Sequence, residues 1–177
     1  GTYIDLIIPD TIEGYPVTSI GSAFNNNKTL RSVIVPNGVV SLEGYSDVYG
    51  AWGTFSGCTS LSKVTLPVSL QKIGVKAFYG CSSLSTITIP EKVTYIGNSA
   101  FYNCTSLANV TIPQNVITIG ESAFSSCKSF TSVTIPDNVI TVGKGAFSSC
   151  NNITKATLSN SMTKVPDSIF SYCTALR

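Results

Sequence analysis

Short apolar stretches alternate with polar ones along this chain, and one pattern of them returns every 23 residues. Residues 84–90 show how a copy begins, with the letters LSTITIP. Ile87 and Ile89 flank Thr88, and this period-two alternation of β-branched residues predicts a strand with one buried face. Pro90 has no amide hydrogen to give to a neighbouring strand, so we expect the strand to end there.

The second half of each copy predicts two further elements. Residues 93–96 indicate another short extended stretch, and Gly97 permits a tight turn after it. Ala100, Phe101 and Cys104 then fall at helical spacing, which predicts one short turn of helix. The next strand follows directly, so each copy is a small unit of two extended stretches and a turn.

Phenylalanine and cysteine mark the register of these copies along most of the chain. Because one copy has nothing of its own to cover its apolar residues, the copies must stack, with parallel strands about 4.8 Å apart. We therefore predict a single domain, 1–177, that forms an α/β solenoid of about seven coils. A parallel β-sheet would form one face, and short strands and short helical turns the other. The marking residues are Phe55, Phe78, Phe101, Phe124, Phe147, Phe170, Cys58, Cys81, Cys104, Cys127, Cys150 and Cys173. The expected repeats are approximately 1–29, 30–60, 61–83, 84–106, 107–129, 130–152 and 153–177.

The frame shared by these copies, L-x-x-V-x-I-P-x-x-V-x-x-I-G-x-x-A-F-x-x-C-x-x, resembles the BspA-like (Treponema-type) leucine-rich repeat family. The resemblance extends from Ile7 to Cys173, which is essentially the whole chain. It implies a right-handed leucine-rich-repeat superhelix. It also implies a secreted or surface-attached bacterial or protozoan protein that adheres to host cells, matrix proteins or other microbes.

Charged residues make up only 11% of the chain, and the formal net charge is +2. This small charge and the lack of any basic run argue against nucleic acid as a partner. No apolar run approaches the roughly 20 residues that a membrane-spanning helix needs, and no signal-peptide pattern is present. The expectation of an extracellular or cell-surface location therefore comes from the family resemblance alone.

The six evenly spaced cysteines leave three alternatives: buried free thiols, disulfides between adjacent coils, or a metal site. Equivalent positions in a stack have parallel Cβ directions, which fit a disulfide poorly. Free cysteine at a core position behaves as a small apolar residue. Since the chain has no histidine and the spacing is not typical of zinc ligands, we expect free buried thiols, no metal and no cofactor.

Two insertions interrupt the regular spacing early in the chain. The larger one lies within 43–53 and holds Tyr45, Asp47, Tyr49 and Trp52 among glycines. Insertions in solenoids form loops that often lie on the binding face. Aromatic side chains beside an acid suit sugar stacking or a peptide contact, so these four residues are candidate partner-binding residues. The alternative is that Trp52 folds back over the edge of the solenoid.

One outward position of each first strand forms a column that is mostly threonine. This hydroxyl-rich, uncharged face is a candidate docking surface for a protein or a glycan. A flat threonine column also fits an ice-binding solenoid, although threonine is simply well tolerated on an exposed strand. The candidate binding residues of the column, which continues from Ile34, are Thr65, Thr88, Thr111 and Thr134.

Nothing in the sequence brings catalytic groups together. Without histidine the chain has no His-based general base and no Ser–His or Cys–His pair. Its nine acids are scattered, and no periodicity sets two of them across a cleft as glycoside hydrolysis requires. We therefore predict no enzyme but a binding or adhesion module that recognises a host or microbial surface protein or a glycan.

Two other roles stay open from the sequence. One is a passive spacer or scaffold within a larger surface protein, whose ligand site lies elsewhere. The other is weak end-to-end self-association, because Leu176 starts a further repeat and no polar cap follows it.

Overall fold

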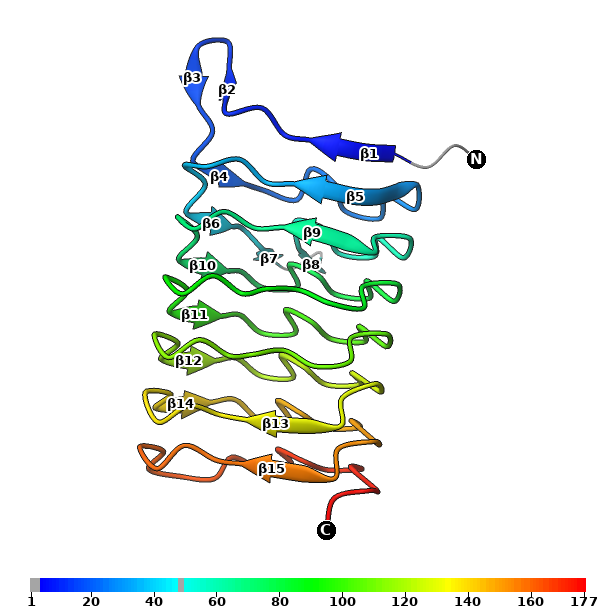
Figure 1. Ribbon diagram of the computed structural model, residues 1–177, viewed down its shortest axis with the longest axis vertical. Helices are drawn as coiled ribbons and strands as arrows, with labels where there is room; N and C mark the ends of the chain where they lie inside the picture. The colour runs from blue at the N-terminus through cyan, green and yellow to red at the C-terminus, as the bar shows by residue number, and fades with distance from the viewer. Residues whose placement is uncertain (1–3, 48–49) are drawn as a thin grey trace.

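The computed structural model, which describes residues 4–47 and 50–177, is a parallel β-solenoid (Figure 1). Its coils stack along one axis, so the two termini lie at opposite ends of the molecule (Figure 1). The longest sheet has six strands, one for each of six turns, where the sequence predicted about seven coils. The parallel stacking itself is confirmed by the pairing of strands between successive coils.

The first strand of each coil forms a sheet that is interrupted in the middle of the solenoid. Ile87 and Ile89 are buried and Thr88 is exposed, as predicted, yet this segment does not form a regular strand. Packing of the apolar side chains therefore determines which residues of the segment point into the core, although the segment lacks a regular ladder of hydrogen bonds. The three-stranded part comprises β1 (Ile4–Ile7), β5 (Leu30–Ile34) and β9 (Lys63–Thr65), and the two-stranded part comprises β13 (Ser132–Thr134) and β15 (Lys155–Thr157).

The second extended stretch of each coil forms the continuous six-stranded sheet. Each strand has two residues, and the second of them points into the core, as Ile73 and Ile96 do. The prediction of a second short strand after each proline is thus confirmed. The strands, in chain order, are β4 (Ser19–Ile20), β6 (Ser41–Leu42), β10 (Lys72–Ile73), β11 (Tyr95–Ile96), β12 (Thr118–Ile119) and β14 (Thr141–Val142).

The predicted short helical turns are wrong, because the described residues contain no helix. The amides of Ser99, Phe101 and Asn103 donate to carbonyls of the next coil, at 2.8, 2.7 and 2.9 Å. Those of Ala100 and Tyr102 donate instead to the carbonyl three residues back, at 3.2 and 3.1 Å. Ser99 and Asn103 also have positive φ, 53° and 57°, which an α-helix does not allow. Every second amide thus bonds between coils, and the segment is a series of turns.

Two side-chain stacks run through the core along the solenoid axis. Neighbouring phenylalanine rings, from Phe24 to Phe170, lie 5.1–5.8 Å apart between centroids. All six cysteines are buried and free, which confirms the prediction of free thiols. Each thiol donates to the carbonyl of a phenylalanine in the preceding coil, as Cys104 Sγ does to Phe78 O at 3.1 Å. The thiols therefore fill space and also satisfy a backbone acceptor in the core.

Both insertions are antiparallel β-hairpins. The first pairs β2 (Thr11–Ile12) with β3 (Tyr15–Pro16) and projects beyond the first coil at the N-terminal end (Figure 1). The second pairs β7 (Tyr45–Asp47) with β8 (Gly50–Trp52) and leaves the second coil after β6. The regular coils are committed to stacking, so these hairpins are the places where the chain departs from the packing pattern.

Candidate functional site

The β7–β8 hairpin carries the aromatic residues that the sequence singled out. Tyr45 and Trp52 lie opposite each other on the two strands, and their exposed fractions are 58% and 41%. Trp52 therefore keeps a substantial part of its surface in contact with water. Asp47 lies in β7 opposite Gly50, whereas Tyr49 lies outside the described residues. The structure thus brings Tyr45 and Trp52 together as one exposed aromatic pair.

Two glycines fix the root of this hairpin against the next coil. A Cβ atom on Gly44 would lie 1.8 Å from the carbonyl oxygen of Val75, and one on Gly53 would lie 1.9 Å from that of Lys76. Such distances are far inside van der Waals contact, so only glycine permits the backbones to approach this closely. The hairpin therefore starts from a backbone-to-backbone contact, which sets its position on the solenoid.

Replacing Gly53 with alanine is expected to lower the free energy of unfolding by about 1–3 kcal/mol, because the new methyl group collides with backbone that cannot rotate away. Urea unfolding followed by the emission of Trp52, the only tryptophan in the chain, measures the change. The matched control is Gly21→Ala, since a Cβ atom there meets nothing within 4 Å. Equal stability of the two variants would contradict the close approach.

Polar contacts hold the chain just before and after the hairpin. Thr54, which is fully buried, donates its hydroxyl to the carbonyls of Ile20 and Glu43, at 3.0 and 3.1 Å. The Ser41 hydroxyl donates to the Glu43 carboxylate, and Lys72 Nζ lies 3.4 Å from the same group. The hydrogen bond from Ser41 and then the charge of Lys72 hold the pKa of Glu43 below its ordinary value. Glu43 thus helps to hold the chain before the hairpin through its contacts with Ser41 and Lys72.

A second aromatic cluster, which the sequence analysis missed, lies next to the hairpin root. Lys76 Nζ is 5.1 Å from the centroid of the Tyr79 ring, and Tyr79 stacks on Tyr102 with centroids 5.0 Å apart and planes 7° apart. The spacing of 23 between these tyrosines was a signal that could have revealed the stack. Because the two rings cover each other's facing surfaces, they offer little face for a ligand. Tyr45 and Trp52 are the better candidates for stacking.

The predicted threonine column keeps its exposure but not its single sheet. Thr65 lies in β9 and Thr134 in β13, while Thr88 and Thr111 lie in the irregular segments between these strands. All four are exposed. An ice-binding surface needs a flat, regular array, and the sheet that carries these threonines is interrupted. The column is better described as a hydroxyl-rich surface that begins at Ile34.

Reactive or metal-binding chemistry has little support in the described part of the chain. Burial raises the pKa of the Cys58 thiol to about 11 and that of Cys150 to about 12, so both stay protonated at neutral pH. Residues 4–47 and 50–177 contain no cluster of three or more His, Cys, Asp or Glu placed to hold a metal ion. Over the same residues, no helix has the length and apolar character needed to cross a membrane.

Comparisons with known proteins agree with this architecture. Residues 52–177 match the family model of the BspA type leucine rich repeat region, in 6 copies. No curated protein matches the chain. Among solved structures, a leucine rich repeat protein from T. pallidum is 32% identical with a TM-score of 0.86, over 100% of this chain and 79% of its own length.

Two other solved relatives are longer. A leucine rich cell surface protein from Faecalibacterium prausnitzii is 32% identical with a TM-score of 0.58, over 92% of this chain and 50% of its own length. A leucine-rich repeat protein from Bacteroides ovatus is 29% identical with a TM-score of 0.70, over 90% of this chain and 46% of its own. The 23-residue frame, the stacked coils and these matches coincide, and the chain belongs to the BspA-type leucine-rich repeat family.

Proposed function

We propose that this chain is a non-catalytic binding module of a secreted or cell-surface protein, and that the β7–β8 hairpin contacts its partner, a protein or a glycan. The exposed pair of Tyr45 and Trp52 carries this proposal. Tyrosine and tryptophan give a large contact area, lose little conformational freedom on binding, and keep a polar group for hydrogen bonding. They are also enriched among the residues that dominate binding energy at interfaces.

The rigid root of the hairpin supports the same role. The glycine contacts with Val75 and Lys76 and the buried Thr54 hydroxyl fix where the hairpin leaves the coil. A site that is already ordered before binding loses less entropy when a partner arrives. The insertion thus combines exposure of the aromatic rings with a fixed base, and it interrupts an otherwise regular stack.

The family and its members support a surface location. Leucine-rich repeat folds are typical of surface proteins and of protein-binding modules, and the solved relative from Faecalibacterium prausnitzii is described as a cell surface protein. This chain spans about half of that protein's length, so the role of that whole protein is not assigned to this chain.

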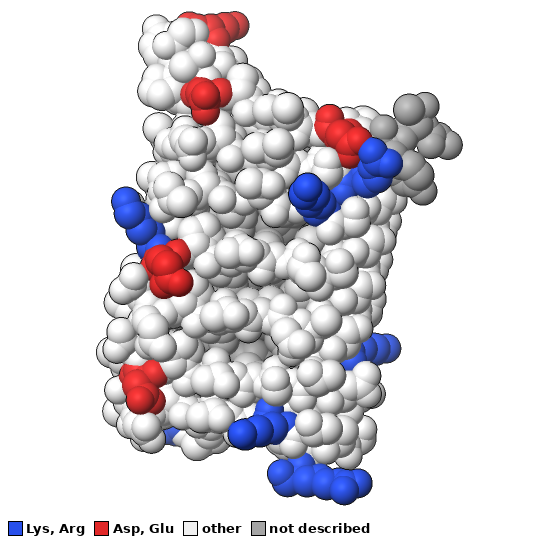
Figure 2. All heavy atoms as spheres, in the orientation of Figure 1, with Lys and Arg blue, Asp and Glu red and all other residues white. Residues whose placement is uncertain are grey.

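A passive spacer is the second candidate function. The face seen in Figure 2 is largely uncharged, and most apolar residues of the regular coils are committed to the core. A rigid, weakly charged rod suits the separation of two other domains as well as it suits binding. A binding experiment with the intact chain separates the two functions.

The double variant Tyr45→Ala/Trp52→Ala is expected to bind the partner at least about tenfold more weakly, because two exposed aromatic contacts are removed. A glycan array and a panel of purified extracellular matrix proteins are the probes, and a shift in the emission of Trp52 reports contact at the hairpin. The matched control, Val165→Ala/Tyr172→Ala, removes exposed apolar surface from the last coil. Equal binding by the hairpin variant would remove the hairpin as the site. Absence of binding by the wild-type chain to every probe would favour the spacer.

A further inference from the structure

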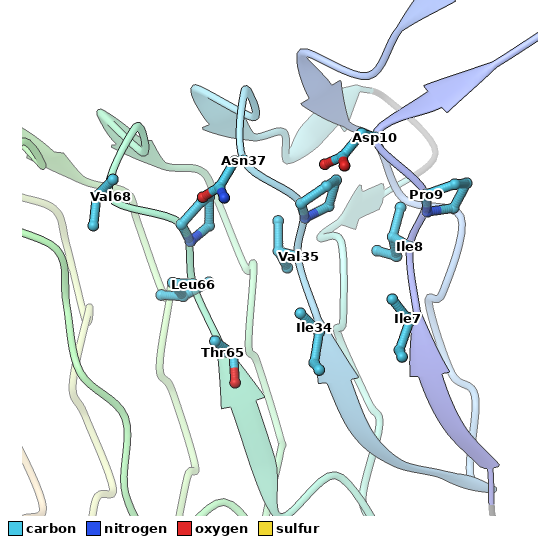
Figure 3. A pocket seen from close by; sticks show the side chains of 12 residues that line it. Ile7, Ile8, Pro9, Asp10, Ile34, Val35, Asn37, Thr65, Leu66 and Val68 are labelled. Atoms are coloured by element: carbon cyan, nitrogen blue, oxygen red, sulfur yellow. The ribbon is translucent and has the colours of Figure 1, made fainter.

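An apolar hollow lies where the strands β1, β5 and β9 end, in the N-terminal part of the solenoid (Figure 3). It has a volume of about 390 Å³. Ile7, Ile34 and Thr65 occupy the same register position on the three parallel strands, so their side chains lie side by side along its floor (Figure 3). Val68 and Asp10 lie beside them, just beyond the strand ends.

Three aliphatic residues of this hollow, Ile7, Ile34 and Val68, are exposed. The exposed fractions are 71% for Ile7, 45% for Ile34 and 76% for Val68. The outward position that Ile7 and Ile34 occupy is threonine in the coils that follow, so the strand accepts a polar residue there. Ile34 has a neighbouring strand on each side, and its exposure therefore does not depend on where the chain begins. Clustered exposed apolar residues of this kind mark interaction sites.

We infer that this hollow is a binding site for an extended peptide segment of a partner protein that carries aliphatic side chains next to a basic residue. The inference deepens the proposed binding function by naming a partner class for a site separate from the hairpin. Pro9, Pro36 and Pro67 form the wall and have no amide hydrogen to donate. Such a wall suits apolar side chains better than the hydroxyl groups of a sugar, which need hydrogen-bonding partners.

The negative charge near the hollow favours a basic residue in the partner peptide. Residues 4–27 contain the acids Asp5, Asp10 and Glu13 and no lysine or arginine. Arg31 pairs with Asp5, whereas no described lysine or arginine forms an ion pair with Asp10, which is exposed at the rim of the hollow. A lysine or arginine of the partner would complement this local negative charge, and an acidic residue would be repelled.

The dimensions of the hollow fit an extended chain. Parallel strands lie about 4.8 Å apart, so the floor from the first to the third strand spans about 10 Å. An extended peptide advances about 3.3 Å per residue, and its side chains i and i+2 lie about 7 Å apart on one face. Two alternate aliphatic side chains therefore fit on the floor that Ile7, Ile34 and Thr65 form. The long, flexible side chain of a neighbouring basic residue extends past the rim toward Asp10.

The test uses labelled 12-residue peptides in which leucine and serine alternate and two central serines are replaced by lysine, glutamine or glutamate. Fluorescence anisotropy with the intact chain is expected to give the affinity order lysine, glutamine, glutamate. Ile7→Thr/Ile34→Thr is expected to weaken binding of the lysine peptide at least tenfold, and Asp10→Asn is expected to remove the preference for lysine over glutamine. Both threonines restore the residue found in other coils, so the fold is expected to persist, which a thermal melt verifies.

The matched control is Ile117→Thr/Ile140→Thr, which removes two exposed isoleucines that lie directly before β12 and β14. This control and the hairpin variant Tyr45→Ala/Trp52→Ala are both expected to bind the lysine peptide as the wild type does. The inference is overturned if no peptide binds, if the glutamate peptide binds as tightly, or if the Ile7/Ile34 variant keeps full affinity. If the hairpin variant loses binding to matrix proteins or glycans but still binds the lysine peptide, the inference about the hollow stands. The two sites are therefore tested separately.

Discussion

Replacing Phe101 with alanine is expected to lower the free energy of unfolding by about 3–5 kcal/mol. The side chain is fully buried, and its ring lies between Phe78 and Phe124, with centroids 5.2 and 5.1 Å away. Removing it opens a cavity in the middle of the stack, where coils on both sides are held by backbone hydrogen bonds and cannot close the gap. The loss therefore includes both the hydrophobic transfer term and the cavity term.

Urea-induced unfolding followed by circular dichroism measures this loss. Tyr102→Ala is the control, because Tyr102 is the next residue, stacks on Tyr79 in the same way, and is only half-buried. We expect the control to cost clearly less. Since each coil of a solenoid contacts only its neighbours, hydrogen exchange in the Phe101 variant should speed up first in the coils around residues 84–129. A loss below about 1 kcal/mol for Phe101→Ala would mean that the phenylalanine stack is not a structural core.

Stability is expected to fall steeply as the pH rises above about 9. The unfolded thiols ionise near pH 8.5. In the folded chain, burial raises the pKa of Cys58 to about 11 and of Cys150 to about 12, and it also raises those of Cys81, Cys104 and Cys127 well above the ordinary value. Above pH 8.5 the unfolded chain loses protons that the folded chain keeps, so the stability is complete below that pH and decreases above it. Each buried thiol contributes up to about 1.4 kcal/mol per pH unit in this window.

Equilibrium unfolding at pH 8, 9 and 10 measures how the free energy of unfolding changes with pH, and this change depends on the number of buried thiols. Cys104→Ala, compared at each pH with its own value at pH 8, is expected to show a shallower decrease because one titrating group is gone. A thiol reagent at pH 8 should detect the six cysteines only after denaturation. Constant stability from pH 8 to pH 10, or thiols that react in the native chain, would show that the cysteines are not buried and protonated.

The candidate site was only partly visible in the sequence. The insertion within 43–53 was recognisable as a break in a regular spacing, but the sequence left open whether Trp52 is exposed or folds back over the edge of the solenoid. The exposure of Tyr45 and Trp52 comes from the structure. Their pairing across a hairpin depends on the register of β7 and β8, which no periodicity specifies. The hollow around Ile7 and Ile34 was also unseen, because it forms from three strands whose outward residues are 27 and 31 positions apart in the chain.

The sequence by itself determined which residues lie inside this solenoid. Stacking of near-identical units places equivalent residues above one another, so a repeating phenylalanine or cysteine has to occupy the same core position in every coil. Only the tertiary structure decided which hydrogen bonds the backbone between these positions makes. Ala100, Phe101 and Cys104 have the local spacing of a helix. The amides of Ser99, Phe101 and Asn103 nevertheless bond to the next coil, and those partners are far away in the sequence. The interrupted first sheet and the turns that replace the helix follow from such contacts between coils, which local pattern does not specify.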